Sequence, residues 1–195
     1  MFFTGVGSRE CPTAVQTLMT SLAQLLANAN YVLRSGGARG ADSAFEAGCD
    51  AGSGAKEIYL PWRGFEKNAS PLFKVGPDAF EMAKLVHPAW EGLSLGERKL
   101  HAQSCYQVLG ASLSTPSQLL VCWTPDGCES QKTRSRKTGG TATSIVLAER
   151  HAVPVFNLRN APSRERLADW LLQRGVSCER IPLRPPSEPL QATLL

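Results

Sequence analysis

The sequence lacks the spacings that cysteine-based sites require. Its six cysteines include no CxxC pair and no companion CxxH, so neither a zinc site nor a redox pair is indicated. We expect most of these thiols to be buried, and we expect no metal and no cofactor. No apolar run approaches the roughly 18 residues of a membrane helix, and no signal peptide precedes the first strand-like segment. The sequence therefore predicts a cytoplasmic, soluble protein without a membrane partner.

The chain instead has the size and composition of a globular domain. Its 195 residues, 43% of them hydrophobic, suffice for one domain with a core and leave little room for two. We expect residues 1–180 to form that domain and 181–195 to form a flexible, proline-rich tail. The net charge of +4 suits anionic ligands without requiring nucleic acid. Much of the excess lies in one cluster: Lys132, Arg134, Arg136 and Lys137.

Strand-like and helix-like segments alternate along the chain. Apolar, partly β-branched runs predict strands near residues 1–7, 31–33, 56–61, 117–124 and 153–157. Helical spacing of apolar residues predicts helices over 12–28, 78–86, 96–110, 142–150 and 163–174, with one more beginning at 41. This alternation predicts an α/β fold with a mostly parallel sheet and helices on both faces.

The turn at residues 33–42 is the strongest candidate for a ligand site. Its glycines, Gly36, Gly37 and Gly40, give G-G-x-x-G, which is neither a Walker A loop nor the dinucleotide fingerprint. Glycine lets backbone N–H groups approach a ligand, and the helix that follows adds partial positive charge, so an anion would suit this turn. A tight turn with small residues for packing is the alternative. Arg39 favours a ligand, because its forked guanidinium suits phosphate or carboxylate.

Two carboxylates follow this turn on one face of the expected helix. Asp42 and Glu46 are four residues apart. In one interpretation, Asp42 favours the helix dipole and Glu46 is solvated. In the other, Asp42 holds Arg39 or a ribose hydroxyl, and both residues are candidates for catalysis.

Further turns share the character of the first. One ends in Ser8 and Arg9, and another spans 138–143, where hydroxyls and glycines open a helix. Because the carboxyl ends of parallel strands meet at one edge of a sheet, these turns are expected to face one crevice. After the third strand, Trp62 or Phe65 would stack on a base, or the tryptophan would pack half-buried. The loop 128–137 is either solvated or a mobile segment that closes over a phosphate.

Six motifs resemble the DprA/Smf-like branch of the SLOG superfamily, which includes YspA/YpsA-related proteins. The resemblance covers residues 2–158 and rests on Gly5-Val-Gly-Ser-Arg9, Ser35-Gly-Gly-Ala-Arg-Gly-Ala-Asp42, His87-Pro88, Gln107-Val-Leu-Gly110, Trp123-Thr-Pro-Asp-Gly127 and Thr138-Gly-Gly-Thr-Ala142. It implies a Rossmann-like three-layer sandwich that binds nucleotides or nucleic acid. The segment His101-Ala-Gln-Ser104 departs from the pattern, since an Arg-Asn pair is expected there.

The resemblance also implies which residues surround the ligand. Gly7, Ser8 and Arg9 would lie against it, Ser35, Gly36, Gly37, Arg39, Gly40 and Asp42 would hold a phosphate or sugar, and Thr138, Gly139, Gly140 and Thr141 would hold a second phosphate. Trp123 would lie at the crevice through the fifth motif. Short members of this branch occur in phages and mobile elements, where sensing or sequestering of nucleotide signals is suspected.

Three functions are compatible with these motifs. We favour binding of a nucleotide-derived small molecule, with Arg9 and Arg39 as phosphate anchors. A phosphoribohydrolase-like activity would place a glutamate near Ile145 or Val146, where none stands, so Asp42 or Glu46 would have to substitute. Binding of single-stranded DNA, as in DprA, is the third. Family habit also suggests a homodimer.

Overall fold

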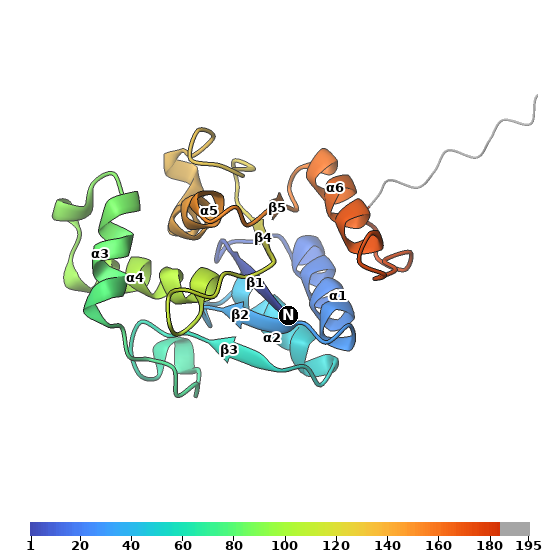
Figure 1. Ribbon diagram of the computed structural model, residues 1–195, viewed down its shortest axis with the longest axis horizontal. Helices are drawn as coiled ribbons and strands as arrows, with labels where there is room; N and C mark the ends of the chain where they lie inside the picture. The colour runs from blue at the N-terminus through green and yellow to red at the C-terminus, as the bar shows by residue number, and fades with distance from the viewer. Residues whose placement is uncertain (184–195) are drawn as a thin grey trace, which may run out of the picture.

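Five short parallel strands form the centre of the computed structural model, which describes residues 1–183 (Figure 1). They lie in the order β3-β2-β1-β4-β5. Their bounds are Phe2–Gly7 for β1, Val32–Ser35 for β2, Lys56–Ile58 for β3, Leu119–Trp123 for β4 and Val155–Asn157 for β5. The order reverses between β1 and β4, which are neighbours in the sheet although more than a hundred residues separate them.

Six α-helices cover the two faces of the sheet. One face packs against α1 (Thr13–Asn28), α2 (Ala41–Ala51) and α6 (Ala161–Leu172). The opposite face packs against α4 (Leu95–Leu109) and α5 (Thr141–Arg150), and α3 (Pro77–Val86) lies against α4. Three short 3-10 helices, η1 (Phe65–Lys67), η2 (Trp90–Gly92) and η3 (Arg136–Thr138), interrupt the loops. The expected α/β, Rossmann-like three-layer fold is confirmed.

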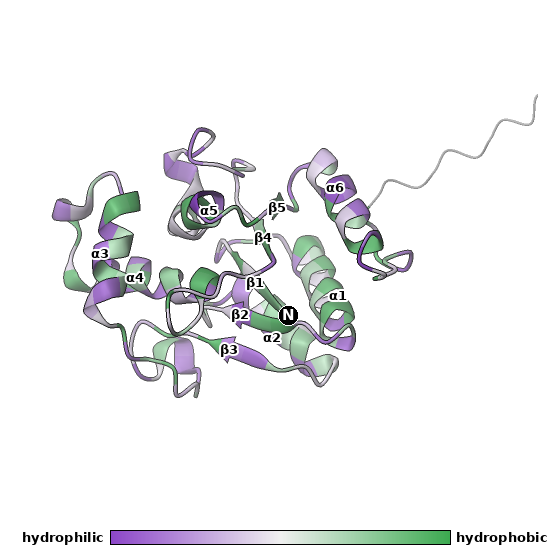
Figure 2. Ribbon diagram, viewed as in Figure 1, coloured by the Kyte–Doolittle hydropathy of each residue, from purple (hydrophilic) through white to green (hydrophobic). Residues whose placement is uncertain are grey.

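Local sequence explains why these elements form and pack. All five residues of β4 are buried, as expected for an inner strand covered on both faces, whereas β3 at the sheet edge is hydrophilic (Figure 2). The helix α4 begins with a capping box in which Ser94 and Glu97 exchange hydrogen bonds. A Cβ at Gly48 would overlap the carbonyl oxygen of Thr20, so glycine there permits α2 to pack closely on α1.

Five of the six cysteines are buried, which confirms the expected role of most of them as small core residues. Cys11 and Cys49 belong to the core on the α1 face, and Cys105, Cys122 and Cys128 belong to the core on the α5 face. Burial raises the pKa of both Cys11 and Cys105 to about 12. Within residues 1–183, no helix combines the length and apolar character that crossing a membrane requires.

The chain stays packed slightly beyond the expected start of the tail at residue 181. Ile181 and Leu183 are buried in the core on the α1 face. The rest of the expected proline-rich tail, residues 184–195, lies outside the described residues.

Candidate functional site

The loops after β1, β2 and β4 meet where the strand order reverses, and there they surround a cavity of about 520 Å³. Open α/β sheets bind ligands at this position, and small-molecule sites commonly have this size. A further wall comes from α4. Many of the residues predicted to surround a ligand line this cavity: Gly7, Ser8, Arg9, Arg39, Asp42, Thr138, Gly139, Gly140 and Thr141.

The turn after β1 is joined directly to the turn after β2. The N–H of Ala41 donates to the carbonyl of Ser8 at 3.2 Å. A Cβ at Gly40, whose φ is +83°, would overlap the carbonyl of Arg9. Because the two turns are in contact, Arg9 and Arg39 approach the cavity from adjacent loops.

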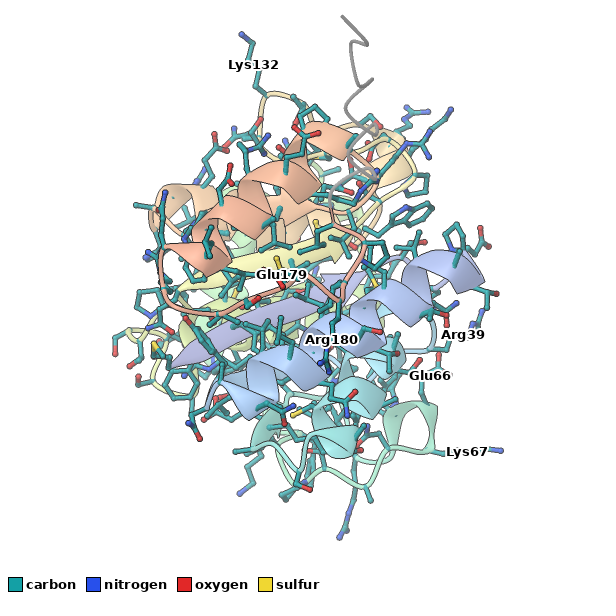
Figure 3. The ribbon with its side chains drawn as sticks, turned by 90° about the vertical axis from the view of Figure 1, so that its right-hand side faces the viewer. Arg39, Glu66, Lys67, Lys132, Glu179 and Arg180 are labelled. Carbon is teal, nitrogen blue, oxygen red and sulfur yellow. The ribbon has the colours of Figure 1, made fainter. Side chains whose placement is uncertain are left out.

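Arg39 is exposed and weakly held. Its Nη1 lies 3.9 Å from Oε1 of Glu66, and 69% of its side chain is accessible; Figure 3 shows the two side chains near each other at the edge of the molecule. Such exposed pairs contribute little, so Arg39 can leave Glu66 for an anion at small cost. The guanidinium of Arg9 lies 5.7 Å from the ring centroid of Phe65, which also lines the cavity.

Asp42 is the buried carboxyl of the site. Its side chain accepts a hydrogen bond from the N–H of Ala38 at 3.4 Å. Burial raises the pKa of this carboxyl to about 7, although backbone N–H groups at residues 38, 7 and 36 and the charge of Arg9 act in the opposite direction. Asp42 therefore titrates near neutral pH and can accept or donate a proton in the cavity.

Glu46, the second candidate catalytic carboxylate, does not line the cavity. Its oxygens accept hydrogen bonds from Nζ of Lys56 and from Nδ2 of Asn68, both at 3.0 Å. The structure thus separates the two carboxylates that the sequence places on one helix face. Asp42 faces the cavity, and Glu46 ties α2 to the strand and loop beyond it.

Several residues in and just before the G-G-x-x-G turn pack against other parts of the protein instead of lining the cavity. Ser35 Oγ donates to the carbonyl of Gly5 at 2.6 Å and links β2 to β1. A Cβ at Gly36 would overlap side-chain amides of α4, and one at Gly37 would lie 2.8 Å from Leu60. These three residues and Gly40 do not line the cavity. The glycines allow close packing here, which was the alternative interpretation of the motif.

The turn before α5 is open by contrast. A Cβ at Gly139 or Gly140 would meet no atom of residues 1–183 within 4 Å. Over the same residues, the N-terminus of α5 has no side-chain cap. Thr138, just before, is buried, and its hydroxyl donates to Asp126 at 2.5 Å. The backbone of this turn is therefore accessible while its base is fixed.

Asp126 anchors the loop that precedes this turn. It also accepts a hydrogen bond from the hydroxyl of Ser135 at 2.5 Å. Although burial acts in the opposite direction, the hydroxyls of Ser135 and Thr138 lower the pKa of Asp126 to about 2. Asp126 thus holds the end of the loop 128–137 in place.

The cluster of four cations in this loop is divided among different environments. Lys137 lines the cavity, and Arg134 donates to the carbonyl of Val86 at 2.9 Å. Lys132 extends away from the body of the protein (Figure 3). A single-stranded nucleic acid partner and a homodimer stay predictions of the sequence.

The two predicted tryptophans do not line the cavity. Trp123 is buried in the core on the α1 face, and only its carbonyl reaches the turn after β1, where it accepts the N–H of Ser8 at 3.0 Å. Trp62 is 40% exposed and packs edge-on against Phe65, with ring centroids 5.2 Å apart. Phe65 is thus the aromatic residue of this loop that faces the cavity.

The wall from α4 was not predicted as part of the site. It contributes Glu97, Leu100, His101, Gln103, Ser104 and Gln107. Polar residues recur on this helix at spacings of three and four, which is a sequence signal for a polar face. The segment 101–104, which differs from the pattern of the resemblance, is therefore in a position where it can contact a ligand.

Gln103 and Gln107 differ in how their buried side chains are satisfied. Both are 4% exposed. Oε1 of Gln107 accepts the hydroxyl of Ser144 at 3.3 Å, whereas Oε1 of Gln103 has no hydrogen-bond partner among residues 1–183. Nε2 of Gln103 donates to the carbonyl of Gly36 at 3.4 Å.

His101 completes this wall as a neutral side chain. Its Nδ1 lies 2.7 Å from Oγ1 of Thr143, and its ring centroid lies 4.3 Å from that of His87. Burial, followed by the charge of His87, lowers the pKa of His101 to about 4. At neutral pH the ring is therefore uncharged.

The position of the hydrolase glutamate carries no carboxylate. Ile145 and Val146 are both buried in the core on the α5 face. Glu149, one turn later, accepts the N–H of Gln131 at 2.6 Å on the surface.

Comparisons with protein-family models, with curated proteins and with solved structures gave no match to this chain.

Proposed function

We propose that this protein binds a nucleotide-derived small molecule in the cavity at the carboxyl edge of the sheet, as a sensor or sequestering protein. The observation that carries the proposal is the meeting of three turns around one cavity, with two arginines on adjacent turns. A phosphate placed there would have charge-assisted hydrogen bonds from Arg9 and Arg39.

The open turn before α5 supports a second contact with the same ligand. Gly139 and Gly140 leave space beside the backbone, and the uncapped helix that follows presents partial positive charge. Lys137 adds a full positive charge to this side of the cavity. Gln103 also lines the cavity, and its side-chain oxygen, which has no hydrogen-bond partner among residues 1–183, supports the proposal.

The proposal is tested by identifying what the protein retains. Purified protein is incubated with mono-, di- and cyclic nucleotides, ADP-ribose derivatives and NAD, and bound molecules are identified by mass spectrometry after denaturation. We expect one class to be retained and released unchanged. Retention of none of them by the folded protein would contradict the proposal.

Hydrolysis of an N-glycosidic bond is a second candidate, favoured by the raised pKa of Asp42. In this reaction Asp42 would accept a proton from the attacking water while the bond between the anomeric carbon and the base nitrogen breaks. The base would leave with the bonding electrons and take up a proton. Asp42→Asn would abolish product formation, whereas Glu46→Gln would preserve it, because Glu46 lies outside the cavity. Product formed at the same rate by Asp42→Asn would remove this candidate.

A further inference from the structure

The floor and the rim of the cavity differ in chemistry. The cationic side chains that line it, Arg9, Arg39 and Lys137, are all exposed at the rim. The buried side chains Asp42 and Gln103 instead offer oxygen atoms. Asp42 has no cation within ion-pair distance in the described part of the chain. Two exposed carboxylates, Glu10 and Glu97, also line the cavity, but the cations outnumber them, so the rim favours a phosphate more than the floor does.

Gln103 has an oxygen that the protein itself does not satisfy. Its carboxamide is oriented by the bond from Nε2 to the carbonyl of Gly36, and exchanging the nitrogen and the oxygen would bring two carbonyl oxygens together. Oε1 is closed off from solvent and lacks a donor among residues 1–183. The bond at Nε2 is long, 3.4 Å, so it holds the carboxamide only weakly.

We propose that the buried end of the ligand carries uncharged hydrogen-bond donors that are accepted by Gln103 and Asp42. This inference rests on the proposed function and adds the orientation of the ligand: its anionic end lies at the rim and its donor end at the floor. The donors are ribose hydroxyls or an exocyclic amine, since both supply uncharged N–H or O–H groups.

Four probes separate these sources when titrated by calorimetry: adenosine monophosphate, its 2′-deoxy form, inosine monophosphate and inorganic pyrophosphate. We expect pyrophosphate, which has no donor end, to bind at least tenfold more weakly than adenosine monophosphate. A tenfold loss with the 2′-deoxy form assigns the floor to the sugar, and the same loss with inosine monophosphate assigns it to the base amine.

Gln103→Met and Gln107→Met are matched variants, because the two residues lie one turn apart and are equally buried. Gln103→Met should lower the affinity for adenosine monophosphate at least tenfold and remove the discrimination between probes. Without ligand it should leave Tm nearly unchanged, because removal of the unpartnered acceptor offsets the loss of the long bond from Nε2 to the carbonyl of Gly36. Gln107→Met should lower Tm, because it leaves Ser144 without its acceptor.

The possible results distinguish this inference from the proposed function. Suppose that the parent binds all four probes with equal affinity and that Gln103→Met binds adenosine monophosphate as tightly as the parent does. The proposed donor end is then wrong, and nucleotide binding stands. If Gln103→Met lowers Tm as much as Gln107→Met, Oε1 is satisfied in the free protein and the inference fails. Failure of all four probes to bind would contradict this inference, whereas the proposed function fails only if no nucleotide of the wider panel is retained.

Discussion

Two glycine-rich turns lead into helices at the cavity, and they are built in opposite ways. The turn before α2 is filled, because a Cβ at Gly36 or Gly40 would overlap atoms of α4 or of the turn after β1. The turn before α5 is open, because a Cβ at Gly139 or Gly140 would meet nothing within 4 Å among residues 1–183. In sequence the two turns look alike.

The difference indicates which atoms of each turn can serve a ligand. The filled turn packs its glycines against neighbouring atoms and presents the side chains of Arg39 and Asp42 to the cavity. The open turn presents its backbone, and its own glycines line the cavity. A run of glycines therefore indicates close approach of something to the backbone, and only the fold determines whether that is protein or ligand.

The largest effect is expected for Gly40→Ala compared with Gly139→Ala. Both glycines have positive φ, +83° and +62°, but only Gly40 is in contact with neighbouring backbone. Gly40→Ala should lower the free energy of unfolding by about 3 kcal/mol or more, through backbone strain and overlap together. Gly139→Ala should cost about 1 kcal/mol from strain alone. Urea denaturation of both variants measures the difference, and equal losses would show that the filled turn is not tightly packed.

The side chain of the filled turn is tested next with Arg39→Ala. Loss of a charge-assisted hydrogen bond should weaken nucleotide binding by about 1.5–3 kcal/mol without altering the free energy of unfolding, because Arg39 is exposed. Lys132→Ala is the matched control, since it removes an equal charge from a side chain that extends away from the protein. Unchanged affinity in Arg39→Ala, measured by calorimetry, would place Arg39 outside the site.

Asp42 gives the filled turn a pH dependence between about pH 4 and 7, whereas Asp126 beside the open turn has a pKa lowered to about 2 and titrates below that range. The pKa of Asp42 is raised, so between about pH 4 and 7 the folded state binds more protons than the unfolded state, and this residue makes stability fall as pH rises. The lowered pKa of His101 acts oppositely, making stability rise between about pH 4 and 6.5. Asp42→Asn should therefore raise the free energy of unfolding at pH 8 by about 1–3 kcal/mol.

Denaturation at pH 5 and at pH 8 separates these two contributions. In Asp42→Asn the His101 contribution remains, so stability should rise more steeply with pH than in the parent. In His101→Gln the Asp42 contribution remains, so the slope should shift toward a fall. A slope unchanged by Asp42→Asn would mean that this carboxyl titrates normally.

The smallest effect on stability is expected for Gly140→Ala. Its φ and ψ, −61° and −27°, suit alanine, and the space beside it is open. The free energy of unfolding should stay constant or rise by about 0.5 kcal/mol, while affinity for the retained nucleotide should fall several-fold because the new methyl group occupies the approach to the backbone. Affinity equal to that of the parent would show that no ligand approaches this turn.

The fold could be predicted because its signals are local. Apolar alternation and helical spacing placed every strand and helix of the sheet layers, and the turns before α2 and α5 fell at glycines. The least accurate end was that of β3, which finishes at Ile58 rather than at residue 61. Leu60 is buried there without extending the strand, so burial alone did not indicate pairing.

The parts of the candidate site that follow from the order of strands along the chain could be predicted. The parts that depend on how a helix is oriented against the sheet could not. Turns after parallel strands must share one edge, so Arg9, Arg39 and Gly139 were placed together correctly. The face of α4 that meets the turns is set by tertiary packing, so Gln103 was missed. Glu46 shares a helix face with Asp42, yet one further turn along α2 brings it to Lys56 instead.

The buried thiols allow the rate at which each face of the sheet opens to be measured separately. A thiol alkylates only as exposed thiolate, and both Cys11 and Cys105 are kept from that state by burial. Alkylation of Cys11 or Cys49 would time exposure of the α1 face, and alkylation of Cys105, Cys122 or Cys128 would time exposure of the α5 face. Both α4 and α5 belong to the α5 face. A ligand that bridges them should therefore slow alkylation of the cysteines on that face more than alkylation of those on the α1 face.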